Sequence, residues 1–118
     1  MRILFSLCLL FTFTIPAGHA EAVRFFESIQ DLPLMPGLVE RAEDSLAFDK
    51  PEGRIVESVA EMQNLSGQAV RDYYGSTLPQ FGWHRAGPNR FVRRNESLEL
   101  AFEALHGVQI MRVSIHPR

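Results

Sequence analysis

The last third of the chain is a series of short runs in which apolar and polar residues alternate, and this feature constrains the fold most. The runs cover residues 82–85, 90–94, 97–103 and 108–115, and segments containing Gly, Pro or Asn separate them. Alternation with a period of two is typical of half-buried strands, and short separations favour hairpins. We therefore expect four antiparallel strands after the middle of the chain.

Apolar side chains on the last two of these runs fall on one face of the expected sheet. The matching rows are Leu98, Leu100 and Phe102 on one run and Met111, Val113 and Ile115 on the next. Because this face is apolar, another element has to cover it.

The middle of the chain predicts a further hairpin. Residues 45–49 and 54–62 alternate in the same way, and Pro51 and Gly53 between them are typical of a tight turn.

One amphipathic helix is expected after that hairpin, with Ser66 as its N-cap. Its apolar face consists of residues at helical spacing: Val70, Tyr74, Leu78 and Phe81. Pro79 and Gly82 should loosen the helix and end it before Trp83.

Together these elements predict an α+β domain over residues 44–118. The single helix packs on one face of an antiparallel sheet of about five to six strands, in the order β-β-α-β-β-β-β.

The preceding residues, 21–43, contain the segment DLPLMPGL at 31–38, in which Pro33 and Pro36 lie among four large apolar side chains. Proline favours an extended backbone and lacks an N–H donor. We interpret 21–43 as an N-terminal strap laid over apolar surface that one helix leaves uncovered. Two alternatives remain at this stage: a disordered tether, and a partner-docking segment that uses Leu34, Met35 and Leu38.

The chain resembles a family of short exported proteins of α-proteobacteria in the stretches DLPLMPGL, FDKPEGRIVESVAEM, VRDYYGSTLPQFGWHR and FVRRNESLELAFE. The most specific parts are the Leu-Pro-x-x-Pro-Gly-Leu pattern and the Tyr-Tyr pair followed by Leu-Pro-Gln-Phe-Gly-Trp. This resemblance implies an exported location and a small α+β fold, and it assigns no catalytic residues.

The first twenty residues predict a signal peptide with cleavage after Ala20. Arg2 precedes an apolar run over 3–15, and Pro16 and the small-residue pattern at 18–20 follow it. That run is shorter than the roughly 20 residues that span a bilayer, so we expect no stable membrane anchor after cleavage. The expected location is therefore periplasmic or secreted.

Charge and cysteine content exclude several classes of function for the exported part. The whole chain carries 12 basic and 14 acidic residues, and removal of Arg2 leaves a net charge of about −3. Such a balance offers no broad attraction for nucleic acid or anionic lipid. The single cysteine, Cys8, lies in the predicted signal peptide, so disulfides and thiolate metal sites are not expected.

Arginines gather around one predicted hairpin and form the candidate anion-binding residues: Arg85, Arg90, Arg93 and Arg94. Guanidinium groups bind carboxylates and phosphates through paired N–H donors. The simpler interpretation is a solvated face with charges that discourage aggregation at a sheet edge.

Catalytic and metal sites are poorly represented in the sequence. There is no Gly-x-Ser-x-Gly motif, and His84, His106 and His116 lack the spacing of a metal site. An enzyme would need two of His84, His106 and Asp72 within hydrogen-bonding reach in a pocket. We expect no enzymatic activity and no cofactor.

The leading functional hypothesis is therefore a non-enzymatic interaction or accessory module that binds another envelope protein. An exposed sheet face, an edge strand or the N-terminal strap would provide the contact, with strand addition as the simplest mode. The alternative is a small anionic or amphipathic ligand bound in a cleft between helix and sheet, with Arg85 or Arg93 as the polar anchor.

Overall fold

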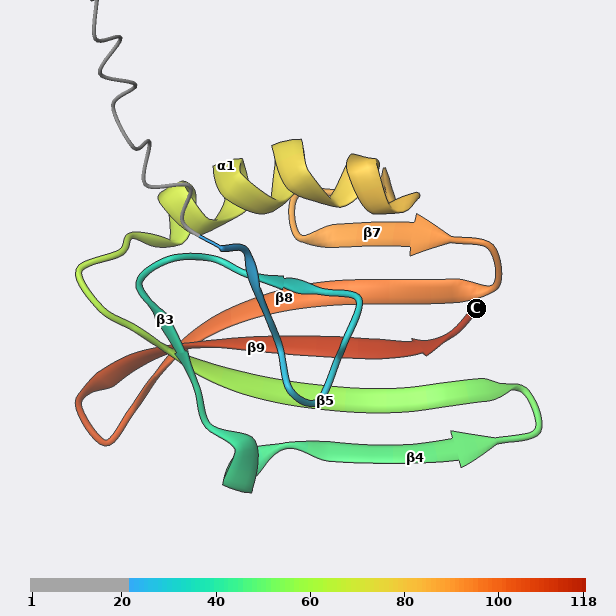
Figure 1. Cartoon of the computed structure of the whole chain (residues 1–118), viewed down its shortest axis with the longest axis horizontal. Helices are drawn as coiled ribbons and strands as arrows, with labels where there is room; N and C mark the ends of the chain where they lie inside the picture. The colour runs from blue at the N-terminus through green and yellow to red at the C-terminus, as the bar shows by residue number, and fades with distance from the viewer. Residues whose placement is uncertain (1–21) are drawn as a thin grey trace, which may run out of the picture.

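The computed structural model describes residues 22–118 and confirms the predicted fold class, with one helical segment packed on an antiparallel sheet (Figure 1). The predicted signal peptide, residues 1–20, lies outside the described residues. The elements are β1 (Arg24–Phe25), β2 (Pro33–Leu34), β3 (Leu38–Glu40), the 3₁₀ turn η1 (Ala42–Asp44), β4 (Leu46–Lys50), β5 (Gly53–Met62), α1 (Gly67–Thr77), the 3₁₀ turn η2 (Leu78–Phe81), β6 (His84–Arg85), β7 (Arg90–Arg93), β8 (Glu96–Leu105) and β9 (Val108–Pro117).

The predicted helix begins and ends where its capping residues indicate. The Ser66 side chain accepts a hydrogen bond from the Ala69 N–H at 3.0 Å. At the other end the α-helix tightens into η2, which begins at Leu78. Gly82 then adopts φ 86, a left-handed conformation that glycine permits without steric cost.

The expected pairing of the last two long strands is also confirmed. In the β8–β9 ladder Leu98 lies opposite Ile115, Leu100 opposite Val113 and Phe102 opposite Met111. These side chains point toward the inner face of the sheet, where α1 contributes Val70 and Tyr74 to the core.

The sheet contains seven strands rather than five or six, in the order β3-β5-β9-β8-β7-β6 with β4 also paired to β5. The additional strand is β3, which forms inside the predicted strap. It pairs with residues 60–62 of β5, while β4 pairs with residues 53–57 of the same strand. Thus β3 and β4 follow one another along a single edge of the sheet.

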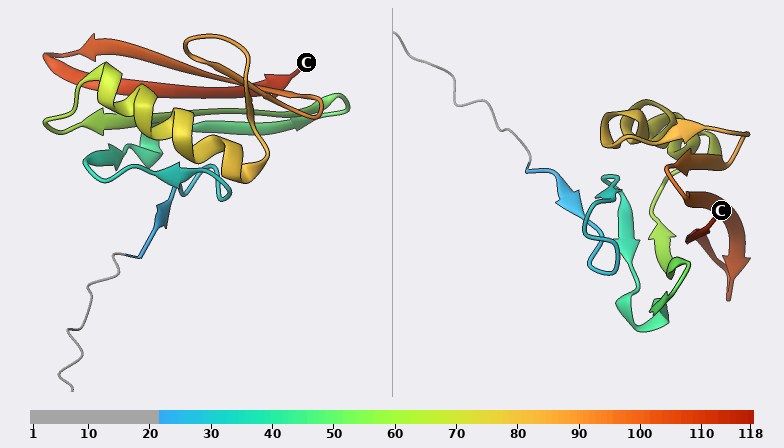
Figure 2. Two further views of the ribbon diagram at one scale, coloured as in Figure 1. Left: turned by 90° about the horizontal axis from the view of Figure 1, so that it is seen from above. Right: turned by 90° about the vertical axis from the view of Figure 1, so that its right-hand side faces the viewer.

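Residues 22–37 cross the inner face beside α1 (Figure 2, left). Phe26, Ile29 and Leu32 are each about 1% exposed and belong to the same core as the helix and the sheet. Val23 to Ile29 contain no helix, and the two-residue β1 pairs with β2 in a separate small sheet. The inner face is therefore covered jointly by α1 and this segment, while no helix in residues 22–118 covers the outer face.

Candidate docking surface at the sheet edge

Strand β4 forms an open edge of the sheet and exposes apolar side chains. Within the described residues its sole strand partner is β5, and all five of its residues are exposed. Leu46 is 55% exposed and Phe48 is 42% exposed. Both lie on the outer face, where Phe48 is opposite Ile55. An exposed edge strand of this kind can accept another strand.

The backbone of β4 also directs hydrogen-bonding groups outward at this open edge, on the side away from β5. Lys50 and Gly53 close the β4–β5 hairpin across a two-residue loop. Because bonded and non-bonded pairs alternate in an antiparallel ladder, Leu46, Phe48 and Lys50 direct their backbone groups toward β5. Ala47 and Asp49 consequently direct their N–H and C=O groups away from the sheet.

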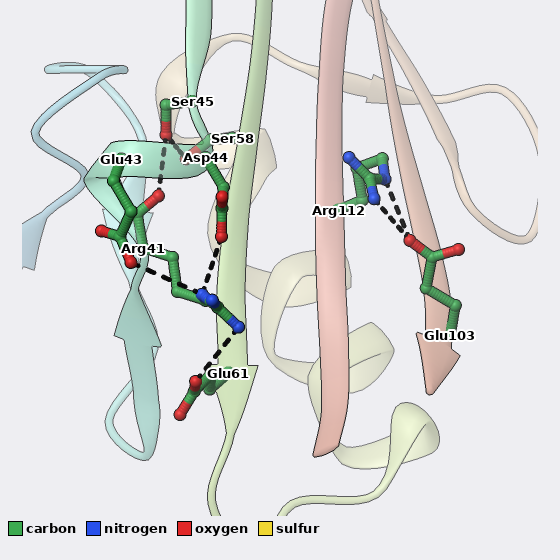
Figure 3. Close-up of polar contacts among 8 residues, drawn as sticks. All are labelled: Arg41, Glu43, Asp44, Ser45, Ser58, Glu61, Glu103 and Arg112. Atoms are coloured by element: carbon green, nitrogen blue, oxygen red, sulfur yellow. Dashed lines mark hydrogen bonds and ion pairs between the residues drawn. The ribbon is translucent and has the colours of Figure 1, made fainter. Parts of the chain in front are cut away.

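The turn η1 separates β4 from β3 and is held by a cluster of ion pairs (Figure 3). The Arg41 N–H donates to the Val59 C=O at 2.8 Å, so Arg41 continues the β3 ladder before the chain turns outward. Its guanidinium lies 2.8 Å from Asp44 and 3.4 Å from Glu61. These contacts fix the point at which β4 begins.

Behind this turn lies a polar cluster that ties the N-terminal segment to the sheet. The Glu40 carboxylate accepts hydrogen bonds from the Glu27 N–H at 2.7 Å and from the Ser28 hydroxyl at 2.7 Å. The buried Ser58 hydroxyl donates to the same carboxylate at 3.2 Å. Burial acts to raise the pKa of Glu40, but the hydrogen bonds outweigh it and lower this pKa. The sequence alone does not predict this cluster, because its three side chains, Ser28, Glu40 and Ser58, come from distant segments.

The outer face beside this edge is braced by a cross-strand ion pair. Arg112 on β9 lies 2.6 Å from Glu103 on β8 (Figure 3). Arg112 also contacts Glu57 on β5. These ion pairs join three neighbouring strands and leave the middle of the face polar. The exposed apolar side chains Leu46 and Phe48 therefore lie at its edge rather than at its centre.

Of the three residues predicted to dock a partner through the strap, one is buried and two are half-buried. Leu38 is 5% exposed, and Leu34 and Met35 are partly buried against the core. The Tyr74 hydroxyl donates to the Pro33 C=O at 2.7 Å and accepts from the Met35 N–H at 3.3 Å. Burial raises the pKa of Tyr74. Helix α1, which covers the sheet, thus also holds the backbone of the N-terminal segment at Pro33 and Met35.

A groove of about 550 Å³ lies between the N-terminal segment and α1. Its lining is mostly apolar and consists of Ala22, Val23, Arg24, Leu34, Met35, Pro36, Gly37, Leu38 and Tyr73. Arg24 supplies the basic group, and no carboxylate of the described residues forms an ion pair with it. The groove is therefore apolar with one cationic side chain at its border.

The structure does not bring the four candidate anion-binding arginines into one patch. Alternation along β7 puts Arg90 on the outer face and Arg93 on the inner face. Arg93 lies over the Trp83 ring at 4.2 Å, donates to the Phe81 C=O at 3.0 Å and contacts Asp31 at 2.8 Å. Arg93 is thus occupied in packing.

The other three arginines remain near the β6–β7 edge. Arg85 lies over the Phe91 ring at 5.3 Å, and Arg90 donates to the buried Ser97 hydroxyl at 3.2 Å. Arg94 occupies the turn before β8 with φ 51. None of these three forms an ion pair with a carboxylate among residues 22–118.

The residues required for an enzymatic site are not joined by hydrogen bonds in the described part of the chain. His84 lies on β6, whereas His106 lies in the turn between β8 and β9. The Asp72 carboxylate accepts from the Gln68 side chain on the same helix. Residues 22–118 contain no group of three or more His, Cys, Asp or Glu side chains that could hold a metal ion. The helix they contain is too short and polar to cross a membrane.

Comparisons with protein-family models, with curated proteins and with solved structures find no match to this chain.

Proposed function

We propose that this protein is a non-enzymatic exported interaction module that binds an envelope protein by strand addition at β4. The observation that carries the proposal is the open edge of β4, where outward backbone groups of Ala47 and Asp49 lie beside the exposed side chains of Leu46 and Phe48. In strand addition, backbone hydrogen bonds supply affinity, and alternate side chains supply specificity. The apolar run of residues 3–15 supports the exported location.

Site-specific photo-cross-linking in cells tests this function. A photoreactive residue at Phe48 should capture a specific envelope protein, whereas one at Met35 should capture no partner because Met35 packs against the core. A third probe at the exposed Gln80, on η2, controls for random collision. Equal capture from all three positions, or none from Phe48, would contradict the proposal.

Two matched proline variants test the mode of binding. Ala47→Pro removes an outward N–H group from β4. Ala104→Pro removes an outward N–H group from β8, at a position beyond the residues of β8 that pair with β7. Both alanines are exposed. Ala47→Pro should abolish capture from Phe48, and Ala104→Pro should leave it intact.

The groove beside α1 favours a second candidate function, the binding of a small anionic amphiphile. Its volume of about 550 Å³ lies within the usual range for small-molecule sites. Arg24 replaces Arg85 or Arg93 as the expected polar anchor, because neither of those residues lines the groove. A fluorescent fatty acid should bind the wild-type protein and lose affinity on Arg24→Glu, but not on Arg85→Glu. Equal affinity in both variants would rule out this candidate.

A further inference from the structure

The two edges of the main sheet carry opposite charge. Residues 42–52, which include η1 and β4, contain four acidic residues and one basic residue: Glu43, Asp44, Asp49 and Glu52 against Lys50. Residues 84–95, which include β6 and β7, contain four arginines and no acidic residue. Arg93 is ion-paired with Asp31, so three of these arginines contribute free charge. The local net charge is therefore −3 at the β4 edge and +3 at the β6–β7 edge, with histidine neutral.

These edges lie at opposite ends of the sheet, because β5, β9 and β8 separate β4 from β7 (Figure 1). Four steps between neighbouring strands correspond to about 20 Å. This separation exceeds the Debye length of about 8 Å at physiological ionic strength, so the charges of one edge are largely screened from those of the other. A partner at one edge therefore meets the local charge of that edge rather than the small net charge of the chain.

The charge of the β4 edge argues against the simplest symmetric dimer. A two-fold pairing of β4 with β4 would place two edges side by side, each with a local charge of −3 after Lys50 is counted. A cationic occupant has no such penalty. Asp49 and Glu52 make no ion pair within the described residues, so they are available to such an occupant.

The chain itself carries the required charge at its opposite edge. Arg85 and Arg94 are exposed and lack carboxylate partners among residues 22–118, and Arg90 is exposed on the outer face of the same edge. Because β6 is only two residues long, this edge offers few backbone groups. A contact with it depends mainly on charge and is therefore sensitive to salt.

From this complementarity we propose that copies of this chain associate head to tail, with the β4 edge of one copy against the β6–β7 edge of the next. The inference rests on the proposed function, since it names a second copy as the partner of the same β4 edge. The contact is heterologous, so an assembly of any length keeps one free edge of each kind. Association therefore continues beyond the dimer as the protein concentration rises.

Sedimentation velocity of the purified protein at about 0.02 M and about 0.5 M salt tests this inference. At low salt the average mass should grow with concentration to more than about twice the monomer mass, and at high salt it should return to the monomer. Two variants separate the edges: Asp49→Lys with Glu52→Lys at the acidic edge, and Arg85→Glu with Arg94→Glu at the basic edge. The side chains of these four residues form no ion pair in the described residues, and Arg85 lies over the Phe91 ring. Circular dichroism verifies that each variant keeps the fold.

Each variant alone should be monomeric, because its two edges then have the same sign. An equimolar mixture should recover the association, since each variant now offers the charge that the other lacks. Persistent association of the basic-edge variant alone would overturn the inference and indicate symmetric β4 pairing.

The failure of the inference is distinguishable from failure of the proposed function. A wild-type protein that stays monomeric while Phe48 still captures an envelope protein overturns head-to-tail association and leaves strand addition at β4 standing. A monomeric protein with no capture from Phe48 overturns both.

Discussion

The N-terminal segment from Phe26 onward and strand β4 both contain large apolar side chains, yet those of the first are packed and those of the second are exposed. Val23 and Phe25, which precede the packed part, are 64% and 44% exposed. In the segment 22–37, Leu32 is buried in the core, and Tyr74 anchors the backbone on either side of Leu34. In β4, Leu46 and Phe48 project from a strand with a neighbour on one side alone. The comparison teaches that apolar content does not separate a packing element from a docking element. The difference lies in how many other elements cover each side chain.

The largest expected effect comes from removing a core side chain of the N-terminal segment. Leu32→Ala should lower the free energy of unfolding by about 2–5 kcal/mol, because it removes buried methyl groups and leaves a cavity. Leu46→Ala, the same change on β4, should cost less than about 0.5 kcal/mol. Urea denaturation measures both values. Similar losses in the two variants would remove the distinction between the regions.

A smaller effect is expected from the hydroxyl that anchors the segment to α1. Tyr74→Phe removes the donor to the Pro33 C=O and leaves that buried carbonyl unpaired, at a cost of about 1–3 kcal/mol. Tyr73→Phe is the matched control, because the Tyr73 hydroxyl makes no hydrogen bond within the described residues. If the two changes cost the same in urea denaturation, the Tyr74 hydroxyl does not anchor the segment.

Acid should weaken the same segment through two carboxylates. Burial acts to raise the pKa of Asp31, but the hydrogen bond from Arg93 and the charges of Arg54 and Arg93 outweigh it and lower this pKa below 3.8. The pKa of Glu40 is likewise lowered below 4.5. Because both values are depressed in the folded protein, their stabilising contribution is present above about pH 4.5 and is lost as the pH falls through the folded values.

The measurement is the free energy of unfolding between about pH 7 and about pH 3. The double variant Asp31→Asn with Glu40→Gln should show a flatter decline than the wild type below about pH 4.5. An equally steep decline would show that other carboxylates control the acid response.

The smallest effect on stability is expected at β4, together with the largest effect on binding. Phe48→Ser should change the free energy of unfolding by less than about 0.5 kcal/mol, since the side chain is already exposed. The same variant should lose the envelope partner in a pull-down experiment, whereas Val108→Ser, at an exposed apolar position near the β8–β9 turn, should retain it. Loss of the partner in both variants would indicate non-specific adhesion.

Local signals were sufficient to predict much of the fold. The Ser66 cap, the period of Val70 and Tyr74, and the alternation in β8 and β9 all depend on neighbouring residues, and the structure agrees with each. Strand β3 was missed because three residues carry little periodicity of their own. Its pairing with residues 60–62 depends on contacts that are distant in the sequence.

The candidate site was less accessible from the sequence. The sequence predicts the hairpin 45–62 but not its exposure, because the absence of a second neighbour for β4 within residues 22–118 is a property of strand order. For the candidate anion-binding arginines, the sequence does contain a signal that two of them lie on opposite faces of the sheet. Arg90 and Arg93 are three residues apart on one strand, and an odd separation places them on opposite faces.

Amide hydrogen exchange of the purified protein, read residue by residue at low concentration and high salt, tests the contrast between the two regions most directly. The account predicts fast exchange at Ala47 and Asp49, slower exchange at Phe48, and protection of Met35, whose N–H is bound by Tyr74. Equal protection of Ala47, Phe48 and Asp49, or an unprotected Met35, would contradict it.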